Sequence, residues 1–186
     1  MARVLVACES SGVVREAFRA RGHAAYSCDI LPADDGSEHH IHGDALAAAL
    51  EQSWDIMIAH PPCTHLAVSG ARWFKEKRKD GRQQAALKFV GDLLAAPISR
   101  IALENPVSVI STYIRKPDQI IQPWQFGHGE QKTTCLWLRN LPPLQPTDIV
   151  DGREQKIWKM PPSEDRWKKR SITYRGIAEA MAEQWG

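Results

Sequence analysis

Short apolar runs alternate with amphipathic stretches along most of the chain. The apolar runs predict buried strands at residues 3–8, 24–28, 55–59, 98–103, 120–121 and 133–138. Between them, apolar residues recur at helical spacing and predict helices at residues 13–21, 45–52, 83–95, 108–115 and 174–185. Because strands alternate with helices, we expect an α/β fold: a doubly wound, mostly parallel, seven-stranded sheet flanked by helices, in which residues 133–138 run antiparallel.

Reactive and polar side chains follow the ends of the predicted strands. Pro61 and Pro62 stop the third strand, because neither can donate to a sheet ladder, and Cys63 follows on the loop. Glu104 follows the next strand, and ligands of open α/β sheets bind at this edge. Cys63 is therefore either a nucleophile or a small space-filling residue. Glu104 is either a carboxylate in the same cleft or an acid that favours a helix N-terminus.

The beginning of the chain has the layout of a dinucleotide- or adenosine-binding crossover. A strand, a turn that ends in Gly12, a helix and a second strand lead to Asp29, which is placed to accept ribose hydroxyls. Asp44 is expected to cap the helix at residues 45–52, and it could also accept a hydrogen bond from an adenine amine. A nucleotide-like cofactor is therefore expected at this end of the sheet.

Composition narrows the class of protein. The 186 residues include 24 basic and 22 acidic ones, so the net charge of +2 does not by itself indicate nucleic acid. We expect a single domain over residues 1–186.

The four cysteines show no C-x-x-C pair and no zinc spacing, which predicts a reduced cytoplasmic protein without a metal. No signal peptide or run of membrane-spanning length is visible, so no membrane association is expected. Residues 32–42 contain three histidines but are expected to be a solvated loop.

Two segments concentrate positive charge. Residues 68–82 contain six basic and two acidic residues, and the irregular segment 139–170 contains eight basic and five acidic ones. Such runs are either solvated faces or mobile loops that contact phosphates. In the second case we expect Trp73 or Trp167 to stack on a base. The phosphate contacts would then come from Lys75, Lys77, Arg78, Lys168 and Lys169.

Several of these residues together resemble a known family. The ordered set is the first strand and its turn, Asp29, Gly43-Asp44, Pro62-Cys63, Glu104-Asn105, Gln131 and Tyr174-Arg175-Gly176. It resembles the cytosine-5 DNA methyltransferases that use S-adenosylmethionine, especially their short phage-type members. The Pro-Cys and Glu-Asn pairs are its most specific part. The resemblance implies the Rossmann-like class I methyltransferase fold.

The resemblance also implies roles for individual residues. Cys63 matches the nucleophile that adds to carbon 6 of cytosine, and Glu104 matches the acid that contacts ring nitrogen 3 and the exocyclic amine. Asp29 matches the ribose-binding acid, Ile30 the residue that packs on adenine and Asp44 the acid at the adenine amine. The other implied cofactor-binding residues are Glu9, Ser10, Ser11, Gly12, Ala45, Pro61 and Gly176. The implied substrate-binding residues are Pro62, Ser69, Asn105, Gln131, Lys132 and Thr133.

The chain also departs from the family pattern. Residues 8–12 replace the usual Phe-x-Gly-x-Gly turn, and Pro106 replaces the Val that usually follows Glu-Asn. Both arginines of the family's Gln-x-Arg-x-Arg strand are absent, and Lys132 or Thr133 is the expected substitute. The short basic segment 139–170 stands in the place of a large target-recognition region.

The expected function is methyl transfer from S-adenosylmethionine to carbon 5 of cytosine in DNA, through a transient adduct at Cys63, in the cytoplasm of a bacterium or a phage-infected host. Two alternatives remain open. The enzyme could modify a free cytosine nucleotide, or transfer a group other than methyl from a modified cofactor. The chain could instead be a catalytically silent module that binds cofactor and DNA.

Overall fold

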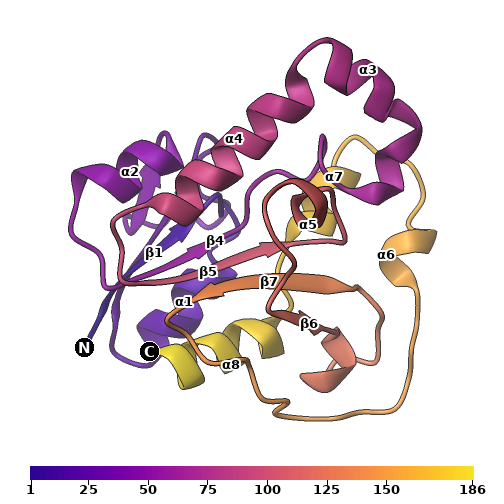
Figure 1. The fold of residues 1–186 in the computed structure, drawn as a ribbon. Helices are drawn as coiled ribbons and strands as arrows, with labels where there is room; N and C mark the ends of the chain where they lie inside the picture. The colour runs from indigo at the N-terminus through magenta and orange to yellow at the C-terminus, as the bar shows by residue number, and fades with distance from the viewer.

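The centre of the structure, a computed structural model, is one sheet with helices on both faces (Figure 1). The structure describes the backbone of residues 1–186 and every side chain except that of Trp158. The strands are β1 (Arg3–Ala7), β2 (Ala24–Asp29), β3 (His40–His42), β4 (Ile56–Ala59), β5 (Arg100–Asn105), β6 (Gln119–Ile121) and β7 (Thr134–Arg139).

The seven strands lie in the order β3-β2-β1-β4-β5-β7-β6. Strands β1 to β5 pair in parallel, whereas β7 is antiparallel to both β5 and β6. The predicted seven-stranded sheet and its reversed strand are therefore confirmed. This is a Rossmann-like, doubly wound α/β fold.

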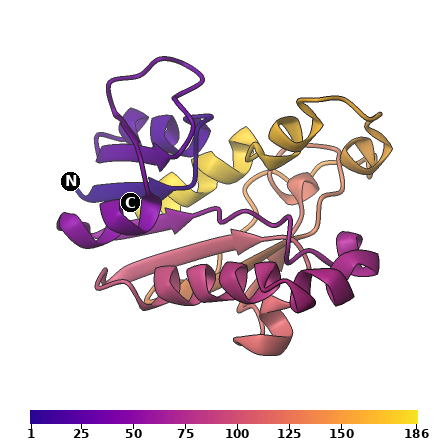
Figure 2. The same ribbon diagram turned by 90° about the horizontal axis from the view of Figure 1, so that it is seen from above.

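The central strands are apolar throughout because both of their faces are covered. On one face, Val4, Val6, Ile56 and Ile58 pack with α1 (Val13–Ala20) and α8 (Arg175–Trp185). On the other face, Leu5, Ala7, Met57 and Ala59 pack with α2 (Ala45–Glu51) and α4 (Arg82–Ala95). Figure 2 shows these two helix layers on either side of the strands. The alternation along each strand thus anchors the carboxyl ends of β1, β4 and β5 in a rigid core.

The connections contain shorter elements. They are η1 (Val68–Trp73), α3 (Phe74–Lys79), α5 (Ile110–Tyr113), η2 (Pro123–Gln125), α6 (Lys156–Lys159) and α7 (Arg166–Ser171). The helix predicted at residues 108–115 is thus only one turn long. The predicted loop at 32–42 ends in strand β3, and the basic run 68–82 is mostly helical. No helix among the described residues is long and apolar enough to cross a membrane.

Candidate active site

Cys63 and Glu104 meet at the carboxyl edge of the sheet. Strands β4 and β5 are parallel neighbours with Ala59 opposite Leu103, so the residues that follow them start side by side. The amide of Asn105 donates to the carbonyl oxygen of Pro61 at 2.9 Å and joins the two loops. Cys63 is exposed, and the charge of Glu104 acts on its thiol. The structure thus brings the Pro-Cys and Glu-Asn pairs together.

The electrostatics of this pair place a proton on sulfur. Loss of hydration against the surrounding loops raises the pKa of Cys63, and the Glu104 carboxylate raises it further, although Arg170 and Lys132 oppose the rise. Burial alone would raise the pKa of Glu104. A hydrogen bond from His60 and the charge of Lys132 outweigh that effect, so the net shift is downward. At rest, the site therefore holds a thiol and a carboxylate.

Two side chains hold the backbone of the loop that carries Cys63. The Lys77 ammonium donates to the carbonyl oxygen of Thr64 at 2.6 Å, and the Gln83 amide donates to that of His65 at 3.2 Å. Lys77 is only 8% exposed. The expectation that Lys77 contacts phosphates is therefore wrong, because its charge is used to fix the loop. Lys77 and Gln83 thus clamp the loop, and Pro62 and Ser69 on either side of this clamp are exposed.

The acids predicted to bind a cofactor gather around the end of β1. Asp29 accepts a hydrogen bond from Leu31 N at 2.9 Å through Oδ1, and Ile30 beside it is 74% exposed. Asp44 caps α2 through Ala47 N at 2.7 Å, as predicted. Burial raises the pKa of Cys8, and the charges of Asp29 and Asp44 raise it further, so both carboxylates act at the same place. Ala45 lies buried just behind Asp44.

The turn after β1 was expected to bind the cofactor, but its Glu9 side chain has a structural role. The Glu9 carboxylate is buried and accepts hydrogen bonds from Val14 N at 2.8 Å and Arg15 N at 3.2 Å, so it caps α1. The Ser11 hydroxyl also donates to Glu9, at 3.2 Å. The Glu9 side chain is thus occupied by the helix. What remains for a ligand is the backbone of Ser10 to Gly12, where Gly12 has a φ of 73°.

Arg15 carries a positive charge within α1 but is fully buried. Its guanidinium donates to the Ser27 hydroxyl at 2.7 Å and also pairs with Asp35. The Ser27 hydroxyl in turn lies 2.8 Å from Nδ1 of His40, whose Nε2 donates to the carbonyl oxygen of Leu31 at 2.9 Å. This chain of contacts fixes the loop after β2. The only sequence signal for it was the acid at position 35.

The segment between α6 and α8 crosses the carboxyl edge. Lys168 of α7 pairs with Asp34 at 2.6 Å on the cofactor side, and Lys132 donates to the carbonyl oxygen of Ile172 at 3.3 Å on the Glu104 side. We call residues 156–173 the strap. A cavity of about 10 Å³, roughly the space of one water, lies beneath it. The cavity is lined by Glu104, Lys132, Thr134, Thr173, Tyr174, Ile177 and Met181.

Both ends of the strap are fixed by one carboxylate. Lys156 pairs with Glu130 at 3.1 Å, and the Tyr174 hydroxyl donates to the other Glu130 oxygen at 2.6 Å. The hydrogen bond and charge of Glu130, after burial, raise the pKa of Tyr174. Arg170 lies within the strap, and its positive charge acts to lower the pKa of Cys63.

The remaining predicted residues have other partners. Gln131 is exposed and meets Gln155, and the Thr133 hydroxyl accepts a hydrogen bond from Gln122 at 2.8 Å. Gly176 donates its amide to His128 Nε2 at 3.1 Å, and a Cβ there would collide with the carbonyl oxygen of Phe126. Gly176 thus serves close packing of α8 rather than an open pocket. Of the predicted Gln131–Thr133 trio, Lys132 alone lines the Glu104 cavity.

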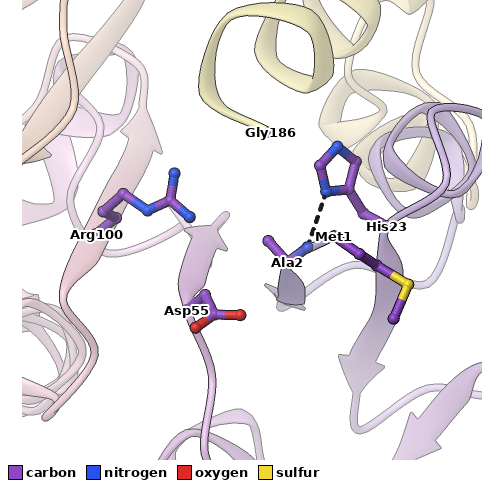
Figure 3. Close-up of a pocket in the computed structure, with 6 residues that line it drawn as sticks. All are labelled: Met1, Ala2, His23, Asp55, Arg100 and Gly186. Carbon is purple, nitrogen blue, oxygen red and sulfur yellow. Dashed lines mark hydrogen bonds between the residues drawn. The ribbon is translucent and has the colours of Figure 1, made fainter.

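A second cavity, of about 350 Å³, lies at the opposite, amino edge of the sheet (Figure 3). Its walls are polar and include His23, Asp55 and Arg100 together with both ends of the chain. None of the predicted site residues lines it. Among the described side chains, no three His, Cys, Asp or Glu residues are grouped to hold a metal ion. The chemistry-bearing residues therefore lie at the carboxyl edge.

Comparisons with known proteins find similarity at the level of structure, not of sequence. No protein-family model matches the chain, and no curated protein matches its sequence. A solved structure from E. coli, described as a candidate DNA modification methyltransferase encoded within a prophage, is similar with a TM-score of 0.47 and 11% sequence identity. The similarity covers 74% of this chain and 46% of that chain, less than half of the neighbour's length. Function must therefore be argued from the residues of this chain.

Proposed function

We propose that this protein transfers a methyl group from S-adenosylmethionine to carbon 5 of cytosine in DNA, through a transient covalent bond between Cys63 and the base. One observation carries the proposal: an exposed thiol lies within reach of the charge of a carboxylate on the neighbouring strand, and the Asn105–Pro61 hydrogen bond joins their loops. Carbon 5 of cytosine is a poor nucleophile. Addition of a thiolate to carbon 6 makes it enamine-like, and a carboxyl group at ring nitrogen 3 assists that addition.

The protonation states of Cys63 and Glu104 suit this chemistry. Sulfur forms a bond to carbon 6 while its proton passes to the Glu104 carboxylate and from there to ring nitrogen 3. Because the Glu104 charge holds the thiol protonated, neutralising that charge makes the thiol more acidic. Once carbon 5 carries the methyl group, with S-adenosylhomocysteine as the leaving group, the proton of carbon 5 leaves to a base in solution. The electron pair of that bond re-forms the ring double bond, Cys63 departs as a thiolate, and the proton on ring nitrogen 3 returns through Glu104 to sulfur.

The residues at the end of β1 fit an adenosine cofactor. The Asp29 carboxylate uses Oδ1 for Leu31 and keeps Oδ2 for a ribose hydroxyl, and Ile30 offers an open apolar face for a base. Asp44 caps α2 with Oδ1 alone, so Oδ2 can accept from an amine. S-adenosylmethionine, when bound, supplies the methyl group. The Glu9 side chain, by contrast, takes no part in holding it.

Substitution of Asp29 by alanine is expected to weaken S-adenosylmethionine binding by about 1–3 kcal/mol, because charge-assisted hydrogen bonds to the ribose are lost. Isothermal titration calorimetry measures this change. Asp92→Ala is the matched control, because Asp92 lies on α4 and pairs only with Lys88. An unchanged affinity in Asp29→Ala would remove Asp29 from the cofactor site.

For DNA binding, the exposed cations Lys75 and Arg78 are the best phosphate contacts on α3, since neither forms an ion pair with a described residue. Binding should then weaken steeply with salt, and each neutralised contact should reduce the slope of log K against log salt by about 0.9 on duplex. Fluorescence anisotropy with Lys75→Gln and Arg78→Gln tests this. Trp73 and Trp167 are both exposed and available for stacking.

Lys88→Gln is the control for these variants, because Lys88 already pairs with Asp92 on α4 and should leave the slope unchanged. A flat salt response of the wild type would contradict DNA as the substrate and favour a free nucleotide. Labelled S-adenosylmethionine should then be incubated separately with duplex DNA, single strands and dCMP. Label in the DNA fractions supports the proposal, whereas label in dCMP alone selects the nucleotide alternative.

A further inference from the structure

His60 occupies a position that neither the sequence motifs nor the proposed roles explain. It is the last residue before the Pro61-Pro62-Cys63 turn, and its backbone amide donates to the carbonyl oxygen of Ala7 at 2.9 Å, so its backbone is tied to β1. Its side chain is only 8% exposed. An imidazole buried this deeply at the carboxyl edge must find polar partners there.

One partner is Glu104. Nδ1 of His60 lies 3.2 Å from Oε2 of Glu104, whose side chain is 15% exposed. Because a carboxylate can only accept, Nδ1 carries the hydrogen and donates it. Among the described residues, Oε1 of Glu104 accepts no hydrogen bond, so this oxygen is the one left for a ligand.

The other ring nitrogen has no partner. Nε2 of His60 is buried and makes no hydrogen bond with any described residue. Burial raises the pKa of Glu9, and His60 is the strongest of the groups that oppose this rise, so the ring stands between Glu9 and Glu104. A histidine kept only for packing would have both nitrogens satisfied, since an unpaired buried nitrogen is costly.

We propose that His60 is a positioning residue for Glu104: its Nδ1 atom fixes one carboxylate oxygen and so presents the other to the target base. This inference rests on the proposed function, in which Glu104 contacts ring nitrogen 3. The hydrogen bond also keeps Glu104 ionised until the base arrives, so that the carboxylate is free to accept the proton of the Cys63 thiol. Other groups also face Glu104: Cys63, Lys132, Cys135 and Tyr174.

Two substitutions separate the hydrogen bond from the ring. His60→Ala removes the donor, whereas His60→Asn places an amide NH₂ near the position of Nδ1 and lacks Nε2. We expect turnover of His60→Ala to fall by at least tenfold with little change in cofactor affinity. His60→Asn should recover most of that loss. His23→Asn, at the amino edge, is the control and should behave as the wild type.

A second measurement does not depend on turnover. Loss of the donor should raise the pKa of Glu104, because the hydrogen bond from His60 lowers it. Carbon-13 NMR of the ligand-free protein, with the Glu104 signal assigned through Glu104→Gln, should show its titration displaced to higher pH in His60→Ala and not in His60→Asn. A merely structural histidine would not produce this pattern.

The outcomes distinguish a failure of the positioning role of His60 from a failure of the proposed function. Two results would overturn the positioning role while the proposed function stands, provided that the wild type transfers methyl groups. In one, Glu104 titrates as in the wild type in His60→Ala and the turnover of this variant is normal. In the other, His60→Asn is as impaired as His60→Ala. If the wild type transfers nothing, the proposed function fails. The NMR titration then still decides whether His60 controls Glu104. A melting temperature within a few degrees of the wild type ensures that folded variants are compared.

Discussion

Cys63→Ala and Cys63→Ser are expected to abolish methyl transfer, with a loss of more than roughly 10³-fold, while the fold and the cofactor affinity stay intact. Alanine has no nucleophile, and a serine alkoxide is not accessible near neutral pH. Cys63 is exposed on a loop that other residues hold, so neither substitution opens a hole in the core. Radiolabel transfer from S-adenosylmethionine to DNA gives the rate.

The covalent bond itself can be trapped. Fluorine at carbon 5 of cytosine cannot leave as a proton does, so DNA that carries 5-fluorocytosine should stay attached to Cys63 in denaturing gels. The wild type should form this complex only with cofactor present, and Cys63→Ala should never form it. Cys135→Ala is a useful control, because Cys135 is a buried thiol on β7 that also feels the charge of Glu104. Appreciable turnover by Cys63→Ala, or no trapping by the wild type on DNA or dCMP, would favour a silent binding module.

Glu104→Gln should have the second largest effect, a loss of roughly 10²–10⁴-fold in turnover, because a neutral amide can hydrogen-bond to ring nitrogen 3 but cannot pass the thiol proton on to it. The same change should have the opposite effect on the free thiol. The Glu104 charge raises the pKa of Cys63, so its removal lowers that pKa and increases the thiolate fraction at a given pH. Alkylation of Cys63 by iodoacetamide should therefore become faster as turnover becomes slower.

Mass spectrometry of the peptide that contains Cys63 measures this alkylation without interference from the other thiols. Asp92→Ala again serves as the control and should change neither rate. If Glu104→Gln slows both alkylation and turnover, the loop has been disturbed and Glu104 has a structural role. If both stay at wild-type rates, Glu104 does not belong to the site.

Much of the fold could be predicted because both faces of the sheet are covered. Strands such as β1 and β4 then consist of continuous apolar runs, and the prolines after β4 mark its end without ambiguity. Strand β3 was missed because it has only three residues, two of them histidines, and sits at the sheet edge. Its histidines form hydrogen bonds with backbone carbonyl groups of the loop after β2 instead of with solvent. No apolar pattern in the sequence indicates these contacts.

The site was less predictable, since its key contacts are made between distant segments. The position of Cys63 and Glu104 followed from strand order, but the clamp from Lys77 reads in sequence as one more charge in a basic run. Arg15 likewise looks like a surface residue until Ser27 and Asp35 are placed against it. Buried charges are identified by their partners, and those partners are fixed only by the tertiary fold.

The anchoring of the strap at Glu130 has an evolutionary consequence. A segment whose two ends meet at one carboxylate is a loop already closed at its base. Lengthening such a loop costs little, about 0.6 kcal/mol for each doubling, and alters no ladder hydrogen bond of the sheet. An inserted module could thus be acquired, exchanged or lost here while Cys63 and Glu104 keep their geometry. The fold therefore accepts additional residues within the strap without disturbing the site.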